Sequence, residues 1–348
     1  MISLSNTAIL ILTCNDFEAL DITIGQVLAT TPASVPVYLL SNCHGLPGAD
    51  ICEDMCRFTA RQNYGRVHWL NPMKAQPAFF GIQDAIENHI DAEYILKLDD
   101  DAFPITPGWL EGLIETYAEQ DPDKIAYVSG LVNNNPYGFH RLTRLPALRE
   151  AYGAIMAQSH MAGEYVPGYQ EFRIAGPGEA DPGGWGTVWQ FPHLARWIHE
   201  ETTLQPERFR ALTADLGPVV FDPKVRYSIN VMLFRRDLWS KVATGGVDDE
   251  EMLNLYCDAN DKTIVIREDI PFVHLYFGPQ KRYLADLLPG VREAYPSPHP
   301  RLVADWDAFK ANWQIELLKK MTGEATIVAL KTVLRRLRNA AGRIVRRR

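Results

Sequence analysis

Short apolar runs rich in β-branched residues alternate with helix-like segments over the first 130 residues, and this alternation constrains the fold most strongly. The runs have the length and composition of buried strands, and they cover residues 8–13, 35–40, 67–70, 94–98 and 125–130. Helix-like segments cover residues 16–30, 78–90 and 109–118, and Asp16 is a candidate N-cap of the first. The alternation predicts βαβ units and therefore an α/β fold, in which helices flank a mostly parallel sheet.

The pattern changes after residue 130. Residues 131–225 are expected to form an insertion or lid over the sheet, because their segment 176–186 is rich in Gly and Pro. Strand-like runs return at 227–234, 263–266 and 272–275, and a helix is expected over 249–258. We therefore expect one domain over residues 1–322, followed by a tail over residues 323–348.

The tail differs in charge from the rest of the chain. The net charge of the whole chain is −8, whereas residues 324–348 hold eight Lys and Arg side chains and one Glu. The acidic body argues against broad nucleic-acid binding. Apolar residues recur at three–four spacing in the tail, which predicts a basic amphipathic helix. Binding to an anionic membrane surface is the role we favour, and a coiled-coil seam or a solvated end are the alternatives.

The five cysteines are odd in number and lack the spacing of a disulfide framework. We expect free thiols in a reducing compartment, in preference to a structural metal or a disulfide. The N-terminal segment lacks the basic region of a signal peptide, and its apolar run is too short to cross a membrane. These features predict a cytoplasmic protein, which the tail could attach peripherally to the inner membrane face.

Three adjacent carboxylates, Asp99, Asp100 and Asp101, follow the strand expected at 94–98. Burying such charges unpaired costs free energy, and a bound divalent cation would offset that cost. Alternate side chains of an extended segment share a face, so Asp99 and Asp101 could reach one ion. Mn²⁺ or Mg²⁺ would suit them, because both ions favour carboxylate oxygens and keep diphosphate oxygens as further ligands. A solvated acidic turn without a metal is the alternative.

Six segments occur in an order that is typical of one enzyme family: AILILTCN, VPVYLLSN, YILKLDDDAFPITPGWLEGL, VMLFRRDLW, DDEEML and FVHL. On these segments the chain resembles the family 2 glycosyltransferases with the GT-A fold. The segments span residues 8–277, about three quarters of the chain, and the one around the acidic triplet is the most specific. The resemblance implies a Rossmann-like sheet, with a nucleotide-sugar half at about 1–130, an inserted acceptor or lid region, and an acceptor or catalytic half at about 226–300.

The resemblance also implies roles for individual residues. The expected metal ligands are Asp99, Asp101 and His274. The expected general base is Asp249, with Asp248 and Glu250 as the other candidates, although acids at this place also favour a helix N-terminus. The expected contacts to the nucleotide sugar come from Thr13, Asn15, Asn42, Lys74, Asp99 and Asp100.

The sequence departs from the family pattern in two places on the donor side. Ser41 and Asn42 stand where relatives often carry an Asp, and the segment around Lys74 lacks the usual Arg-Asn pair. The choice between a UDP-sugar and a GDP-sugar therefore stays open. Trp185 and Trp189 are candidates for stacking on an acceptor sugar, and packing within the loop is equally compatible with the sequence.

The resemblance implies metal-assisted, inverting transfer of a sugar from a nucleotide diphosphate to the hydroxyl of a glycan or lipid-linked acceptor, in cell-surface glycan or glycolipid synthesis. Two other functions are compatible with such a core. A sugar-nucleotide nucleotidyltransferase usually needs a Gly-rich phosphate loop after the first strand, and TCNDFEAL contains no Gly. A noncatalytic nucleotide- or carbohydrate-binding protein is disfavoured by the intact acids, but they do not exclude it.

Overall fold

The structure is a computed structural model that describes residues 1–42, 49–71, 78–162, 188, 191–221, 228–242, 249–275 and 280–297. Met1–Pro296 form one compact unit. The boundary expected at residue 322 and the basic tail lie outside the described residues. Among the helices that are described, none combines the length and the apolar character needed to cross a bilayer.

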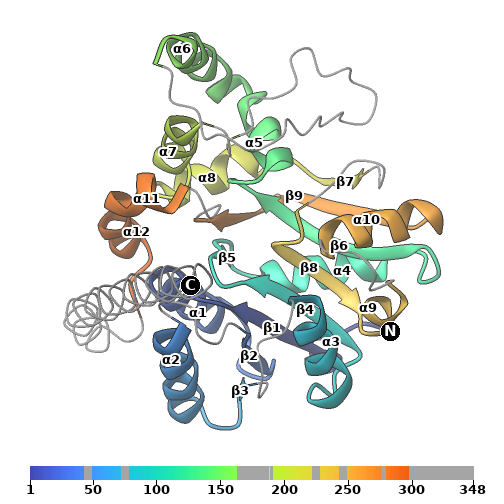
Figure 1. Ribbon diagram of the computed structural model, residues 1–348. Coiled ribbons are helices and arrows are strands. Elements are labelled where there is room, and N and C mark those ends of the chain that lie inside the picture. The colour runs from blue at the N-terminus through green and yellow to red at the C-terminus, as the bar shows by residue number, and fades with distance from the viewer. Residues whose placement is uncertain are drawn as a thin grey trace, which may run out of the picture. The chain divides into compact units, whose positions relative to one another are not determined.

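Within the described residues, nine strands form one sheet in the order β3-β2-β1-β4-β8-β6-β9-β5, and β7 pairs with β9 (Figure 1). The strands are β1 (Thr7–Thr13), β2 (Val37–Ser41), β3 (Val67–Leu70), β4 (Tyr94–Asp99), β5 (Ala102–Pro104), β6 (Ile125–Val132), β7 (Pro218–Phe221), β8 (Val231–Arg235) and β9 (Thr263–His274). Strands β1, β2, β3, β4, β6 and β9 share one direction, whereas β5, β7 and β8 run antiparallel to their neighbours.

Helices flank this sheet. They are α1 (Phe17–Thr30), α2 (Ala49–Gln62), α3 (Ala78–Asn88), α4 (Trp109–Ala118), α5 (Pro136–Thr143), α6 (Pro146–Ala162), α7 (Pro192–Glu201), α8 (Pro206–Thr213), α9 (Asp237–Lys241), α10 (Asp249–Ala259), α11 (Lys281–Leu284) and α12 (Leu288–Ala294). Helix α2 packs on β2 and β3, α4 packs on β6, β8 and β9, and α8 packs on β9. The arrangement confirms the predicted fold class, an α/β fold with a Rossmann-like, mostly parallel sheet, as expected for the GT-A type.

The apolar runs form strands because the sheet buries them almost completely. Ile9, Leu10 and Ile11 of β1 are fully buried, as are Ile95 and Leu96 of β4. Asp16 caps α1 as predicted, since its carboxylate accepts a hydrogen bond from the backbone N–H of Ala19 at 3.2 Å. The first helix therefore begins directly after the loop that follows β1, at the edge where the acidic triplet also lies.

The two short strands expected before residue 276 are one strand, β9. Its polar middle stays in the sheet because each side chain there has a partner. Arg267 pairs with Asp269 at 2.6 Å, and Glu268 accepts a hydrogen bond from the hydroxyl of Tyr137 at 2.6 Å. A shift in the pairing of β6 with β9 directly after Gly130 accommodates this polar stretch.

The expectation that all five cysteines are free thiols is wrong for Cys14, which is disulfide-bonded. Its partner lies outside the described residues. Cys52, Cys56 and Cys257 are free and buried, in agreement with the prediction. Cys14 directly follows β1, where segments that are distant in the sequence come together in the fold. The spacing of the cysteines along the sequence therefore does not indicate its pairing.

Candidate active site

The acidic triplet lies at the carboxyl end of β4, on the same side of the sheet as the carboxyl ends of β1 and β2. Thr13 at the end of β1 is paired with Ser41 of β2, and Leu12 is paired with Asp99 of β4. The carboxyl ends of parallel strands form the usual ligand-binding edge of an α/β sheet. The structure therefore brings the predicted residues Thr13 and Asp99 to one edge, although they are far apart in sequence.

Strand β9 brings His274 to the same edge. Ala102 of β5 is the cross-strand partner of His274, and the N–H of Leu275 donates to the carbonyl of Asp101 at 2.9 Å. As a result, the Nε2 atom of His274 lies 3.4 Å from Oδ1 of Asp101, and both side chains are largely buried. Burial lowers the pKa of His274, but the contact with Asp101, the hydrogen bond to the Asn134 carbonyl and the nearby Asp99 charge together outweigh burial and raise it to about 9.

Two asparagines that follow β6 hold His274 in place. Asn133 accepts a hydrogen bond from the backbone N–H of His274 at 2.9 Å, and the carbonyl of Asn134 lies 2.9 Å from Nδ1 of its ring. Nδ1 therefore donates to this carbonyl, and Nε2 points to Asp101. Sequence reasoning missed both asparagines, because residues of this type before Pro136 are also typical of an exposed turn.

The asparagines belong to a buried polar network. Asn133 donates to the hydroxyls of Thr202 and Thr203, at 2.9 Å in each case. Asn134 lies 3.2 Å from Nε2 of His199, and the other ring nitrogen of His199 lies 2.7 Å from the Thr203 hydroxyl. Burial, with a smaller effect from nearby His274, lowers the pKa of His199 to about 3. The network thus contains a neutral imidazole and connects α7 with the residues behind His274.

Asp99 has partners for both of its carboxylate oxygens. Oδ1 is ion-paired with the ammonium group of Lys97, and Oδ2 accepts a hydrogen bond from the amide of Asn230 at 2.8 Å. The Lys97 ammonium also donates to the carbonyl of Ile229 at 2.8 Å. The same Asn230 nitrogen lies 3.3 Å from Nε2 of His274. Asp99, Asn230, His274 and Asp101 therefore form one continuous row of contacts.

Asp100 points to the loop after β1. Its carboxylate accepts a hydrogen bond from the backbone N–H of Cys14 at 2.8 Å. Burial, and next the neighbouring Asp101 charge, raise the pKa of Asp100 well above its ordinary value. On the same side, Asp16 is ion-paired with Lys281 at 2.9 Å. Lys281 of α11 is a cation near the triplet that sequence reasoning also missed, because nothing in its local sequence indicates this contact.

The predicted donor-binding residues differ in exposure. Thr13 and Asn42 are buried, whereas Asn15 is exposed. A side chain on Gly81 of α3 would lie 2.5 Å from Oδ1 of Asn42, so the helix approaches Asn42 at a distance that only Gly allows. Lys74 lies outside the described residues, so the structure leaves its predicted donor contact as a prediction.

The predicted general base begins α10. Asp249 is the first residue of this helix, and the carboxylate of Glu250 accepts a hydrogen bond from the backbone N–H of Ile229 at 3.2 Å. Ile229 precedes Asn230, whose carbonyl accepts a hydrogen bond from the N–H of Asp99 at 3.1 Å. The start of α10 therefore adjoins the row of contacts around Asp99. Asp248, Trp185 and Trp189 lie outside the described residues.

These side chains supply two of the ligands that a divalent metal would need. No three His, Cys, Asp or Glu side chains of the described segments form a group that could hold one. Asp101 and His274 nevertheless suit two ligand positions around one metal ion. Oδ1 of Asp101 and Nε2 of His274 are 3.4 Å apart, and Nδ1 of His274 already donates to a carbonyl. Asp99 is the weaker candidate, since both of its oxygens already have partners. The pair fits a metal that takes its remaining ligands from substrate oxygens.

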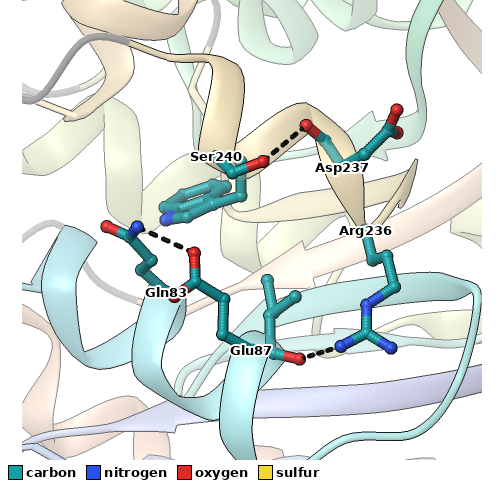
Figure 2. A pocket seen from close by; sticks show the side chains of 7 residues that line it. Gln83, Glu87, Arg236, Asp237 and Ser240 are labelled. Atoms are coloured by element: carbon teal, nitrogen blue, oxygen red, sulfur yellow. Dashed lines mark hydrogen bonds between the residues drawn. The ribbon is translucent and has the colours of Figure 1, made fainter.

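A pocket lies at the opposite edge of the sheet. It has a volume of about 270 Å³. Figure 2 shows the side chains of α3 and α9 that line it. Gln83 donates to Glu87 at 2.9 Å on its wall, and Arg236 donates to the carbonyl of Ile86 at 2.5 Å. The backbone N–H of Arg236 also donates to the backbone carbonyl of Glu93 at 2.9 Å, and Glu93 directly precedes β4. The pocket is therefore separate from the candidate active site, and it is lined by none of the predicted site residues.

Comparisons with known proteins concern the fold alone. No protein-family model matches the sequence. No curated protein matches it either. Among solved structures, the chain is similar to one described as the crystal structure of GalNAc-T7 with UDP, GalNAc and Mn²⁺, with 12% sequence identity and a TM-score of 0.46. The match covers 78% of this chain but 43% of the other, so the chain spans less than half the length of that protein.

Proposed function

We propose that the chain is a metal-assisted glycosyltransferase of the family 2 type, which transfers a sugar from a UDP- or GDP-sugar to an acceptor hydroxyl. The observation that carries the proposal is the contact between Asp101 and His274 at the carboxyl edge of the sheet, next to the start of α10. Nucleotide ligands of α/β proteins bind at such edges. The side chains that gather there are of the types that glycosyl transfer needs.

Asp101 and His274 would hold the divalent ion, Mn²⁺ or Mg²⁺. When bound, such an ion stabilises the negative charge that develops on a departing nucleoside diphosphate. The carbonyl of Asn134 orients the His274 ring for this role, and Asn133 fixes its backbone. Asp99 is not among the ligands that we propose, because Lys97 and Asn230 occupy its oxygens.

Asp249 would remove the proton from the acceptor hydroxyl as the sugar is transferred. Asp249 is the first residue of α10. The Glu250 carboxylate accepts from the N–H of Ile229 and the Asp249 carboxylate accepts from the N–H of Glu250 at 3.1 Å, so the choice of Asp249 rests on the resemblance to the family. A base on the acceptor side agrees with inversion at the sugar carbon, and we propose that stereochemical course.

The donor would lie over the ends of β1 and β2. Thr13, Asn15, Asn42 and Asp100 are the proposed contacts, together with Lys74. Asn42 can hydrogen-bond the edge of uracil or guanine through its amide. Trp185 and Trp189 are the proposed acceptor contacts.

The acceptor and the location are the remaining parts of the proposal. We propose a glycan or lipid-linked acceptor in cell-surface glycan or glycolipid synthesis, at the cytoplasmic face of the membrane, to which the basic tail binds. Flotation with anionic liposomes tests this part by comparing the full chain with a variant that ends at Gly323. Equal flotation of the two would contradict it.

The function itself is tested with a panel of nucleotide sugars and Mn²⁺ or Mg²⁺, by measuring nucleotide release. We expect release to require the metal, and Asp101→Ala to lower it by at least about a hundredfold, as for loss of a main electrostatic stabiliser. Asp215→Ala, at an exposed carboxylate, is the matched control. Pyrophosphate release from a nucleoside triphosphate and a sugar phosphate would instead indicate a nucleotidyltransferase. Binding of the nucleotide sugar without turnover would indicate a noncatalytic protein.

A further inference from the structure

A buried lysine in the candidate active site, Lys97, is ion-paired with Asp99, which is one of the predicted metal ligands. Lys97 is in the middle of β4 and is 2% exposed, although lysine is almost never fully buried unless it is paired. Its ammonium group has two described partners, the Asp99 carboxylate and the carbonyl of Ile229. Burial lowers the pKa of Lys97, but Asp99 and then Asp249 raise it above its ordinary value overall, so the lysine keeps its charge.

The partners of Asp99 separate it from the metal position. Because Lys97 and Asp99 are two residues apart in a strand, their side chains share one face, and the ion pair forms within β4 itself. The other Asp99 oxygen is bound by Asn230, which lies 3.3 Å from Nε2 of His274. Oδ1 of Asn230 is buried and has no hydrogen-bond partner among the described residues. A buried acceptor without such a partner, on a side chain that contacts His274, marks a place where a further ligand or a water would be needed.

We propose that Lys97 is a built-in cation that holds Asp99 out of the metal shell, so that the protein offers a divalent ion one carboxylate, Asp101, and the imidazole of His274. This inference rests on the proposed function, because it concerns the metal of the same site. The affinity of an oxygen site for a divalent ion rises with the number of charged ligands. A site with one available carboxylate therefore binds the ion weakly until the diphosphate of the donor adds its own charge.

Removal of the Lys97 charge should strengthen metal binding, although the loss of a buried ion-pair partner usually weakens a site. Replacing Lys97 by Met keeps an unbranched side chain that is one atom shorter, and it removes the charge. Asp99 is then released from its cation, and the site gains a second carboxylate for a metal. The variant should therefore bind Mn²⁺ more tightly than the unchanged chain in the absence of nucleotide. A purely structural role of Lys97 would give unchanged or weaker binding.

The experiment is a titration of the full chain with Mn²⁺ alone, followed by the electron paramagnetic resonance signal of the free ion. We expect Lys97→Met to raise the Mn²⁺ affinity about tenfold, the scale on which outer-shell partners change metal affinity. Lys97→Met combined with Asp99→Asn should bind within about threefold of the unchanged chain, because the released carboxylate is absent. Lys241→Met is the matched control, since Lys241 is ion-paired with Asp237 at the opposite edge of the sheet.

The outcomes separate this inference from the proposed function. Unchanged or weaker Mn²⁺ binding in Lys97→Met, with circular dichroism that shows a folded chain, overturns the role of Lys97. If that variant does not fold, Lys97→Gln is titrated in its place with the same expected direction. Asp101→Asn should weaken Mn²⁺ binding, and if it has no effect, the metal site of the proposed function fails. Weaker binding in Asp101→Asn without stronger binding in the Lys97 variants contradicts the Lys97 inference alone.

Discussion

His274 and Asp101 face each other because the backbone pairs their strands. Ala102 and His274 are cross-strand partners, and the N–H of Leu275 donates to the carbonyl of Asp101 at 2.9 Å. The 3.4 Å contact between the two side chains therefore depends on the register of β5 against β9 and not on the side chains alone. A substitution at either residue would remove a proposed metal ligand without removing the strand pairing that positions the other.

The base role of Asp249 predicts a loss in the chemical step. We expect Asp249→Asn to lower kcat by about a hundredfold to ten-thousandfold, because the amide cannot accept the acceptor proton. Binding of the nucleotide sugar should change little, since Asp249 is proposed to contact the acceptor side. Steady-state kinetics and equilibrium binding of the nucleoside diphosphate check both expectations. Asp258→Asn on the exposed part of the same helix should keep the activity, and an equally strong loss there would argue against a specific role of Asp249.

The buried network behind His274 predicts a loss of stability. Asn133→Ala would leave the backbone N–H of His274 without its side-chain acceptor and would remove the amide that donates to the hydroxyls of Thr202 and Thr203. An unsatisfied buried polar group costs about 1–3 kcal/mol, so we expect the free energy of unfolding to fall by at least about 2 kcal/mol. Urea unfolding measures this change. Asn88→Ala, which removes an exposed hydrogen bond to Asp84, should lower it by less than about 0.5 kcal/mol.

The first part of the fold follows from the sequence because buried strands have a simple pattern. The sequence predicts β3 and α4 with their observed bounds, since a short apolar run and an amphipathic helix leave few alternatives. It does not predict α2, whose buried residues Ile51, Met55 and Thr59 recur at helical spacing between polar positions. The pattern was present there, but cysteines and charged residues obscured it.

The site is predictable where local motifs define it and not where distant partners do. The acid-rich segment and the FVHL segment point to Asp101 and His274, and the structure brings these two together. Lys97 could not be recognised, because a single lysine in an apolar run does not show that it pairs with Asp99 and the carbonyl of Ile229. Asn133 is similar, since its buried partners Thr202 and Thr203 are distant from it in the sequence.

His199 predicts a dependence of stability on pH. Its pKa is about 3 in the folded chain and about 6.5 when unfolded, so the unfolded state binds more protons between these values. His199 therefore does not lower the free energy of unfolding above about pH 6.5. It lowers this free energy as the pH falls towards 3, by about 2 kcal/mol at pH 5. Urea unfolding at pH 7.5 and pH 5.0 should show a smaller pH effect in His199→Gln. The same substitution at exposed His89 should leave the effect unchanged, and equal pH effects in all three proteins would contradict the prediction.

The close approach of α3 to Asn42 predicts a defect in donor binding. Gly81→Ala places a methyl group 2.5 Å from Oδ1 of the buried Asn42 side chain, which must move away from the end of β2. Because Asn42 is proposed to contact the base of the donor, we expect KM for the nucleotide sugar to rise about tenfold, as for the loss of one hydrogen bond of about 1.4 kcal/mol, with a smaller change in kcat. Gly153→Ala in α6 is the matched control, since its added methyl group meets nothing within 4 Å. An unchanged KM in Gly81→Ala, together with unchanged binding of both UDP and GDP, would remove Asn42 from the donor site.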